Sequence, residues 1–391
     1  MVSFRSCLPS LLFLTGIFFL NIVSRTVIGP MMPTIQRELN IGHGEAGSLF
    51  LLISLGYFAG LLGSGFVSSR FTHRITIILS SLAVGGSLLA VALSQRLWGI
   101  WSGLILLGLS AGLYLPSGIA ILTDMVNPRD WGKATAVHQL STGLGFIVAP
   151  LLAEGLMIWF SWRGVLALLG GTAVVAGVAF TRFKGGAFSG ETILSSQALR
   201  VLFTQASFWI MVTLFSIGIG ANIGVYSMLP LYLVAEKGLE RGCANILLAL
   251  SRIAGLPVAF LMGWLADRIG SRRALGGVLL ATGMATVLLG MAHGVSIIPV
   301  LFLQTPLAGS FFTVGVPALS RISPPQIRNV AVSFTLSVAN LLGGGAIPAG
   351  IGIMGEEGFF PVGIILVGFL LMGSLIILKY LRLVEDPVLG I

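Results

Sequence analysis

Long apolar stretches alternate with short polar connections along the whole chain. Each stretch is about 20 residues long and carries few charges, which is what a helix needs to cross ~30 Å of hydrocarbon. The sequence lacks the short alternating segments that are typical of a membrane β-barrel. We therefore predict an all-α membrane protein with twelve transmembrane helices, at residues 9–33, 47–68, 75–94, 97–123, 133–159, 162–181, 207–235, 243–266, 274–293, 296–320, 329–354 and 359–381. The first stretch is too long for a secretory signal and lacks a small-residue cleavage site, so we interpret it as helix 1.

Composition agrees with this pattern, because 56% of the residues are hydrophobic and only 9% are charged, against about 25% charged in a soluble protein. The net charge of +9 is a topology signal rather than a nucleic-acid site. With the N-terminus inside, fifteen of the 22 Lys and Arg residues fall in cytoplasmic segments and two lie inside helices. Cytoplasmic loops carry such an excess, so we expect both termini in the cytoplasm. The outer segments hold only Arg37, Arg96, Arg163, Lys237 and Arg241.

The chain divides into two similar halves. Segment 182–206 is the longest polar connection, and we interpret it as a cytoplasmic linker between six-helix bundles at 1–181 and 207–391. The halves match at an offset of 198 residues, for example at Gly65 with Gly263 and at Pro150 with Pro348. Such an internal repeat is typical of secondary transporters, whose substrate site lies between the repeats near the middle of the membrane.

The loop after helix 8 carries a recognisable motif. Residues 263–273 read GWLADRIGSRR, which closely resembles the G-x-L-A-D-R-x-G-x-R-R signature of the major facilitator superfamily. The resemblance covers the whole chain and implies a twelve-helix transporter of alternating access. A carboxylate beside guanidinium groups at a helix end can pair with them or with a neighbouring helix N-terminus. We therefore expect a cytoplasmic latch that stabilises the outward-facing state, made by Gly263, Asp267, Arg268, Gly270 and Arg272; the alternative is a solvated loop that only sets topology.

The equivalent loop of the first half departs from the motif. It keeps Gly65, Arg70 and Arg74, but Ser69 stands at the acidic position and Thr72 at the second glycine position. The two halves are therefore not expected to latch equally.

Two arginines lie inside the predicted helices, one in each half. Arg25 is about eight residues from the outer end of helix 1, or ~12 Å deep, and Arg252 is about nine residues from the outer end of helix 8, or ~13 Å deep. No Asp or Glu falls in the middle of a span. Buried guanidiniums without counter-ions are costly unless an anion visits, and arginine suits bidentate carboxylate or phosphate binding. We predict that the pair binds an anionic solute, although each could instead snorkel or bind backbone carbonyls.

Polar side chains near the arginines are candidates to complete the site. An interhelical hydrogen bond is the alternative for each. His138, inside helix 5, is a candidate for proton coupling, with a packed polar residue as the alternative. The candidate substrate-binding residues beside Arg25 and Arg252 are Asn21, Tyr57, Asn222, Tyr226, Gln304 and Asn340.

Within the superfamily, the arrangement of cations on helices 1 and 8 resembles that of monocarboxylate and other organic-anion carriers. A multidrug or neutral-solute exporter is an alternative, but residues 145–150 of helix 5, GFIVAP, lack the glycines of the exporter signature. A third possibility is a non-transporting sensor or assembly factor on the same scaffold. Such a protein need not keep a charged central cavity or an intact loop motif, whereas this sequence is expected to have both.

We therefore expect a monomeric, multi-pass carrier of a bacterial inner membrane for a small organic anion, in particular a carboxylate. Anion exchange, a proton carried by the substrate or by His138, and simple facilitation all stay open. No nucleophile with a base, metal cluster or phosphate loop is visible, so we expect neither an enzyme nor a cofactor, and no nucleic-acid partner.

Overall fold

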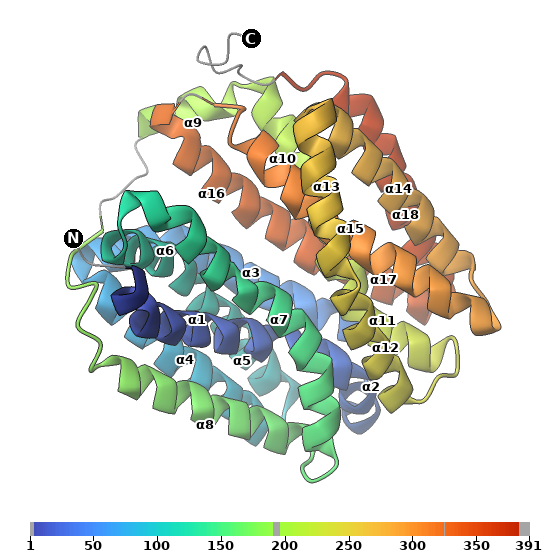
Figure 1. Cartoon of the computed structure of the whole chain (residues 1–391). Helices are drawn as coiled ribbons and strands as arrows, with labels where there is room; N and C mark the ends of the chain where they lie inside the picture. Colours follow the sequence, from blue (N-terminus) through green and yellow to red (C-terminus); the bar gives the residue numbers. More distant parts are fainter. Residues whose placement is uncertain (1–3, 191–195, 324, 383–391) are drawn as a thin grey trace. The chain divides into compact units, whose positions relative to one another are not determined.

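The computed structural model describes residues 4–190, 196–323 and 325–382, and these residues are almost entirely helical (Figure 1). By length and composition they contain 12 helical stretches able to cross a membrane, which confirms the predicted fold class. The first six spans are Phe4–Leu39, His43–Arg70, His73–Leu93, Leu97–Met125, Pro128–Met157 and Trp162–Phe180. Spans 7 to 12 are Ala206–Ala235, Arg241–Ile269, Ser271–Met291, Gly294–Leu319, Val330–Glu356 and Phe360–Leu378.

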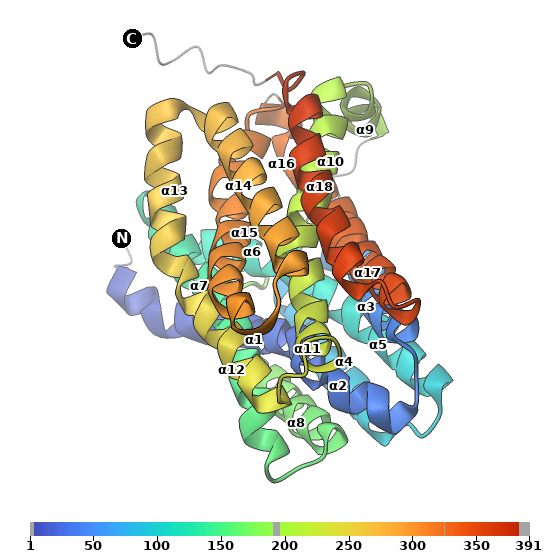
Figure 2. The same ribbon diagram turned by 90° about the vertical axis from the view of Figure 1, so that its right-hand side faces the viewer.

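Several spans extend beyond their predicted ends or are broken inside. Span 1 is 36 residues long and runs past its predicted end at residue 33. The prediction fell short because the last turns carry polar side chains, which lower the hydropathy of that stretch. Span 1 is divided into α1 (Phe4–Thr26) and α2 (Ile28–Leu39), and span 4 into α5 (Leu97–Gly112) and α6 (Tyr114–Met125). Span 8 is divided into α12 (Arg241–Ile253) and α13 (Gly255–Ile269), both labelled in Figure 2.

Each of these three breaks has the same cause. The first half-helix ends four residues before a proline, Pro30, Pro116 or Pro257. A proline ring clashes with the carbonyl four residues earlier and provides no N–H to bond it. Spans 7 and 11 instead contain a π-helical turn: η2 (Gly220–Gly224) lies between α10 (Ala206–Ile219) and α11 (Val225–Ala235), and η4 (Leu342–Ala346) between α16 (Pro325–Leu341) and α17 (Ile347–Glu356).

The chain forms two compact units. Unit 1 comprises residues 1–42, 49–192 and 229–249, and unit 2 comprises residues 43–48, 193–228 and 250–391. These units are defined by contacts and have other boundaries than the sequence repeat. The division into six-helix bundles at 1–181 and 207–391, joined by a linker at 182–206, stays a prediction.

In unit 1, α4 (His73–Leu93) packs along α8 (Trp162–Phe180), and α1 packs along α7 (Trp131–Met157) (Figure 1). A short 3₁₀ turn, η1 (Pro128–Asp130), precedes α7. α3 (His43–Arg70), most of which belongs to this unit, crosses α5 closely: a Cβ at Gly108 would lie 2.0 Å from the carbonyl oxygen of Ile53. Small residues allow such backbone contact in lipid.

In unit 2, α14 (Ser271–Met291) packs along α18 (Phe360–Leu378) and also against α15 (Ile297–Leu319), which follows the 3₁₀ turn η3 (Gly294–Ser296). The two π-helical turns pack directly on each other: a Cβ at Gly224 would lie 2.4 Å from the carbonyl oxygen of Gly343. Glycine at both positions lets the two backbones meet in the middle of spans 7 and 11.

The predicted linker has local structure of its own in the described residues. A helix that the sequence did not predict, α9 (Ser196–Phe203), lies in its second part, and residues 191–195 lie outside the described residues. In its first part, main-chain oxygens of Phe188 and Gly186 accept hydrogen bonds from the N–H groups of His73 and Arg74, at 3.0 and 2.9 Å. These N–H groups open helix α4 and have no partner within it, so the linker caps that helix.

Candidate functional site

The charges within the spans are sorted by depth. Every Asp and Glu in the twelve spans of the described residues lies within three residues of a span end, and most Lys and Arg lie close to an end as well. Arg25 and Arg252 are the exceptions, 14 residues before Leu39 and 11 residues after Arg241. Charged groups at such depth are expensive and mark functional sites by default.

Both arginines occupy the last turn of a half-helix, Arg25 in α1 and Arg252 in α12. The proline-induced break behind each one leaves carbonyl groups without helical partners, and the helix dipole places negative potential there. The two breaks thus provide local stabilisation for a cation without any acidic side chain.

The Arg25 guanidinium lies over the ring of Tyr57 in unit 1, with Cζ 4.1 Å from the ring centroid. Tyr57 is buried on α3, next to the close crossing with α5. The Nε atom of Arg25 is buried and has no hydrogen-bond partner among the described residues. Two of the candidate substrate-binding residues, Arg25 and Tyr57, are therefore in contact, and the Nε donor of Arg25 is left without a hydrogen-bond partner among the described residues.

Arg252 has the corresponding arrangement in unit 2, with more partners. Its Cζ lies 4.2 Å from the ring centroid of Tyr226. One terminal nitrogen donates to the side-chain oxygen of Asn222 at 2.5 Å, and the other donates to the main-chain oxygen of Asn222 at 2.6 Å. Three predicted site residues thus form one cluster, and these partners of the guanidinium are neutral.

Gln304 supports this cluster from α15. Its amide donates to the main-chain oxygen of Ala221 at 3.2 Å and to the hydroxyl of Thr286 at 3.4 Å. The N–H of Val225 bonds the oxygen of Gly220, five residues back, so the oxygen of Ala221 lacks the donor that a regular α-helix would give it. Gln304 therefore stabilises the π-helical turn that carries Asn222.

Two predicted site residues face elsewhere. Asn21 is buried and donates to the main-chain oxygen of Ala111 at 3.2 Å. Asn340 donates to the oxygen of Leu336 in its own helix at 2.8 Å. Neither contact involves an arginine, so both side chains fit the alternative of structural hydrogen bonding.

His138 lies in the core of unit 1. It is 1% exposed, its ring stacks on Phe18 at 4.5 Å, and its Nε2 lies 3.1 Å from the hydroxyl of Tyr114. That hydroxyl donates its own proton to the oxygen of Leu14, so it accepts from Nε2–H. Proton coupling by His138 stays a prediction, and these contacts favour a packing role.

The predicted latch residues lie in the loop between α13 and α14. Asp267 is exposed, the guanidinium of Arg268 lies 4.1 Å above the ring of Trp264, and Arg272 donates to the main-chain oxygen of Lys379. Gly270 has φ of +86°, a conformation that favours glycine. Gly263 is half-buried beside Thr313. None of the three ion pairs of the described residues includes Asp267, so the latch stays a prediction.

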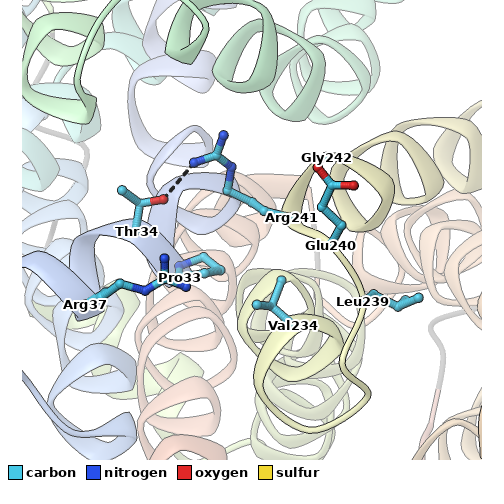
Figure 3. A pocket seen from close by; sticks show the side chains of 8 residues that line it. All are labelled: Pro33, Thr34, Arg37, Val234, Leu239, Glu240, Arg241 and Gly242. Atoms are coloured by element: carbon cyan, nitrogen blue, oxygen red, sulfur yellow. Dashed lines mark hydrogen bonds between the residues drawn. The ribbon is translucent and has the colours of Figure 1, made fainter.

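Sequence reasoning missed a polar cluster in unit 1, which we call the distal cluster: Thr34, Glu154, Arg241 and Asn245. Arg241 pairs with Glu154 at 2.8 Å. It also donates to the hydroxyl of Thr34 at 2.9 Å, the dashed line in Figure 3. The side-chain amide of Asn245 donates to the main-chain oxygen of Pro30 at 3.2 Å. A cavity of about 350 Å³ borders the cluster, lined by Pro33, Thr34, Arg37, Val234, Leu239, Glu240, Arg241 and Gly242. The spacing of Arg241, Asn245 and Arg252 on one face of α12 was the available signal.

Comparison with known proteins decides the family. The family profile described as Major Facilitator Superfamily matches residues 14–258, more than half of the chain. The chain belongs to the major facilitator superfamily. It is therefore a transporter rather than an enzyme, and an integral multi-pass membrane protein.

Several members of the superfamily are similar in sequence. A probable nitrate/nitrite transporter of Mycobacterium tuberculosis is 27% identical over 302 residues, which cover 74% of this chain and 73% of the relative. A 4-hydroxybenzoate transporter of Acinetobacter baylyi is 22% identical, covering 81% and 78%. A multidrug resistance protein of Escherichia coli is 22% identical, covering 80% of each chain.

Solved structures of superfamily transporters share the fold. A bacterial homologue of the human lysosomal transporter Spinster aligns with a TM-score of 0.81 at 15% identity over 97% of each chain. A D-xylose–proton symporter aligns with a TM-score of 0.79 at 16% identity, over 95% of this chain and 97% of the other.

Proposed function

We propose that this secondary transporter carries a small oxyanion, in the first place an organic carboxylate, whose charged group is bound by Arg25 and Arg252. The single observation that supports this most is the depth of the two guanidiniums in spans whose acidic residues all lie near an end. A carboxylate or a similar anion would supply the missing negative charge.

The geometry around each arginine supports an oxyanion in particular. All N–H donors of a guanidinium lie in its plane, and here a tyrosine ring covers one face at 4.1 or 4.2 Å. Recognition must therefore occur along the edges, where two oxygens of one anion can accept two parallel hydrogen bonds. Tyr57 and Tyr226 hold the guanidiniums flat, with a contribution of about 0.5–2 kcal/mol from each cation–π contact.

The relatives support the same class of substrate. Two of them are named for anions, nitrate or nitrite in one case and 4-hydroxybenzoate in the other. Nitrate, nitrite and a carboxylate all present two oxygens on a planar centre. Inorganic and aromatic oxyanions therefore belong in the test panel beside aliphatic carboxylates.

A multidrug exporter is the second candidate, because one relative bears that name. Two deep guanidiniums would repel a cation at short range in a medium of low dielectric, so the charge pattern favours the anion.

The transport cycle would use the two repeated halves, 1–181 and 207–391, with Asp267 and its neighbouring arginines as the cytoplasmic latch. The exposed carboxylate of Asp267 would find its partner in another conformational state. Loss of uptake in Asp267→Asn, with binding of the solute retained, would support this step.

The test is uptake into proteoliposomes of labelled nitrate, 4-hydroxybenzoate, lactate and a phosphate ester. Arg25→Gln and Arg252→Gln are compared with the wild type, and Arg96→Gln, at an exposed loop position, is the matched control. We expect one class of oxyanion to enter wild-type and control vesicles and to be excluded by both deep variants. Uptake of a neutral or cationic solute that neither deep variant reduces would contradict the proposal.

A further inference from the structure

The two deep arginines differ in what holds their edges. The terminal nitrogens of Arg252 form one edge, and Asn222 presents two oxygens to it, at 2.5 and 2.6 Å. That is the pattern in which a carboxylate receives an arginine, one oxygen for each nitrogen. The Nε atoms of both arginines are buried and have no hydrogen-bond partner among the described residues, so the two side chains differ in the Asn222 contacts of the terminal nitrogens.

Asn222 lies in a segment whose conformation depends on its neighbours. It belongs to the π-helical turn η2, and its main-chain oxygen is one of the two atoms that Arg252 holds. Gln304 holds the preceding oxygen, of Ala221, at 3.2 Å. Two side chains from other spans thus bind consecutive carbonyl groups of the widened turn, and π-helical turns of this kind are frequent at functional sites.

The turn also lies next to the positions where spans 7 and 8 pass from one compact unit to the other. Span 7 changes unit after residue 228, six residues after Asn222, and span 8 changes back after residue 249, three residues before Arg252. The hydrogen bonds between Arg252 and Asn222 therefore connect the two spans close to both transitions.

We propose that Asn222 is a positioning residue that takes the place of the transported anion on Arg252. This inference rests on the proposed function and adds a role for one of its residues. The arriving anion replaces both oxygens of Asn222 on the terminal nitrogens of Arg252. A charged acceptor displaces an amide because its hydrogen bonds to a guanidinium are about twice as strong.

The exchange couples binding to the conformation of span 7. When the anion occupies Arg252, the main-chain oxygen of Asn222 loses the hydrogen bond from the guanidinium, and the π-helical turn loses one of the two side-chain contacts described above. The free energy of the widened turn then rises relative to a regular helix, because a hydrogen bond from a charged donor is lost. Solute binding thereby biases the segment that packs on η4.

The test uses two substitutions whose effects on affinity should have opposite signs. Asn222→Ala removes the competing side-chain oxygen, so the anion should bind about tenfold more tightly. Asn222→Asp has the same shape and supplies a permanent carboxylate, so the anion should bind at least about tenfold more weakly. Dissociation constants for nitrate and 4-hydroxybenzoate are measured by calorimetry on the purified full-length protein, with Asn127→Ala, in an exposed turn, as the control.

Opposite shifts in the two variants, with Asn127→Ala unchanged, support the inference. If both variants bind more weakly, or if Asn222→Ala binds as the wild type does, Asn222 is a structural residue or a direct ligand and the inference is overturned. The proposed function then still stands on the wild-type affinity. If the wild type binds neither probe while remaining folded, the oxyanion site itself fails, and the inference fails with it. Should Asn222→Ala not fold, Asn222→Leu, which keeps the approximate size of the side chain and removes its oxygen, takes its place with the same expected sign.

Discussion

Replacing Glu154 with glutamine should loosen the distal cluster of unit 1 by an amount that the geometry allows us to estimate. Glu154 receives the Nε of Arg241 at 2.8 Å and a terminal nitrogen at 2.8 Å, and the two side chains are only 18% and 32% exposed. Breaking a fully buried pair costs about 3–5 kcal/mol. The partial exposure lowers this to about 2 kcal/mol, which changes the ratio of folded to unfolded protein about thirtyfold.

The assay is the free energy of unfolding by sodium dodecyl sulfate, measured for Glu154→Gln, Arg241→Gln and the double variant. We expect the two single losses to add to more than the loss in the double variant, with a coupling free energy of about 1–2 kcal/mol. Asp130→Asn is the matched control, because its partner Lys133 is 71% exposed and should contribute less than ~0.5 kcal/mol. Additive losses at Glu154 and Arg241 would refute the reasoning.

Three further outcomes are expected. Tyr226→Phe should keep the affinity for the transported anion and Tyr226→Leu should lower it several-fold, because the face-on contact contributes about 0.5–2 kcal/mol; calorimetry measures both. Gly108→Ala should destabilise the protein by about 2 kcal/mol or more in the same unfolding assay, since its Cβ would lie 2.0 Å from a carbonyl oxygen. Gly63→Ala is the control and should leave the free energy of unfolding unchanged, because a Cβ there would have nothing within 4 Å. His138→Gln should lower stability by about 1–3 kcal/mol without changing the pH profile of uptake, because the ring is packed in an apolar core; a shifted profile would restore its role in coupling.

The number and order of the spans could be predicted because each one is a long apolar run. In hydrocarbon, where no water is present, such a run must make its backbone hydrogen bonds internally, as a helix does. The breaks within spans 1, 4 and 8 were missed. A hydropathy window does not register that Pro30, Pro116 and Pro257 each remove a hydrogen bond four residues earlier. Reading Pro30 and Pro257 as breaks would also have placed Arg25 and Arg252 at helix ends.

The sequence was enough to single out the two charged residues of the candidate site, but not to predict which polar side chains contact them. Arg25 and Arg252 stand out in the sequence because nothing else charged lies so deep. Tyr57, Asn222 and Tyr226 do contact them, but Asn21 and Asn340 are turned toward backbone carbonyls. Which polar side chain faces a neighbour depends on how each helix is rotated about its axis, and helices that are apolar nearly all round, as α1 is around Asn21, give little amphipathic signal to fix that rotation.

Solute counterflow tests the central claim most directly, because it requires alternating access and binding but no knowledge of the coupling ion. Proteoliposomes are loaded with an unlabelled oxyanion and diluted into the labelled one, for the wild type, Arg25→Gln, Arg252→Gln and Arg96→Gln. Transient accumulation in the wild type and Arg96→Gln, and none in either deep variant while both remain folded, is the predicted result. Counterflow that persists unchanged without Arg25 and Arg252, or that occurs only with neutral or cationic solutes, would contradict the account.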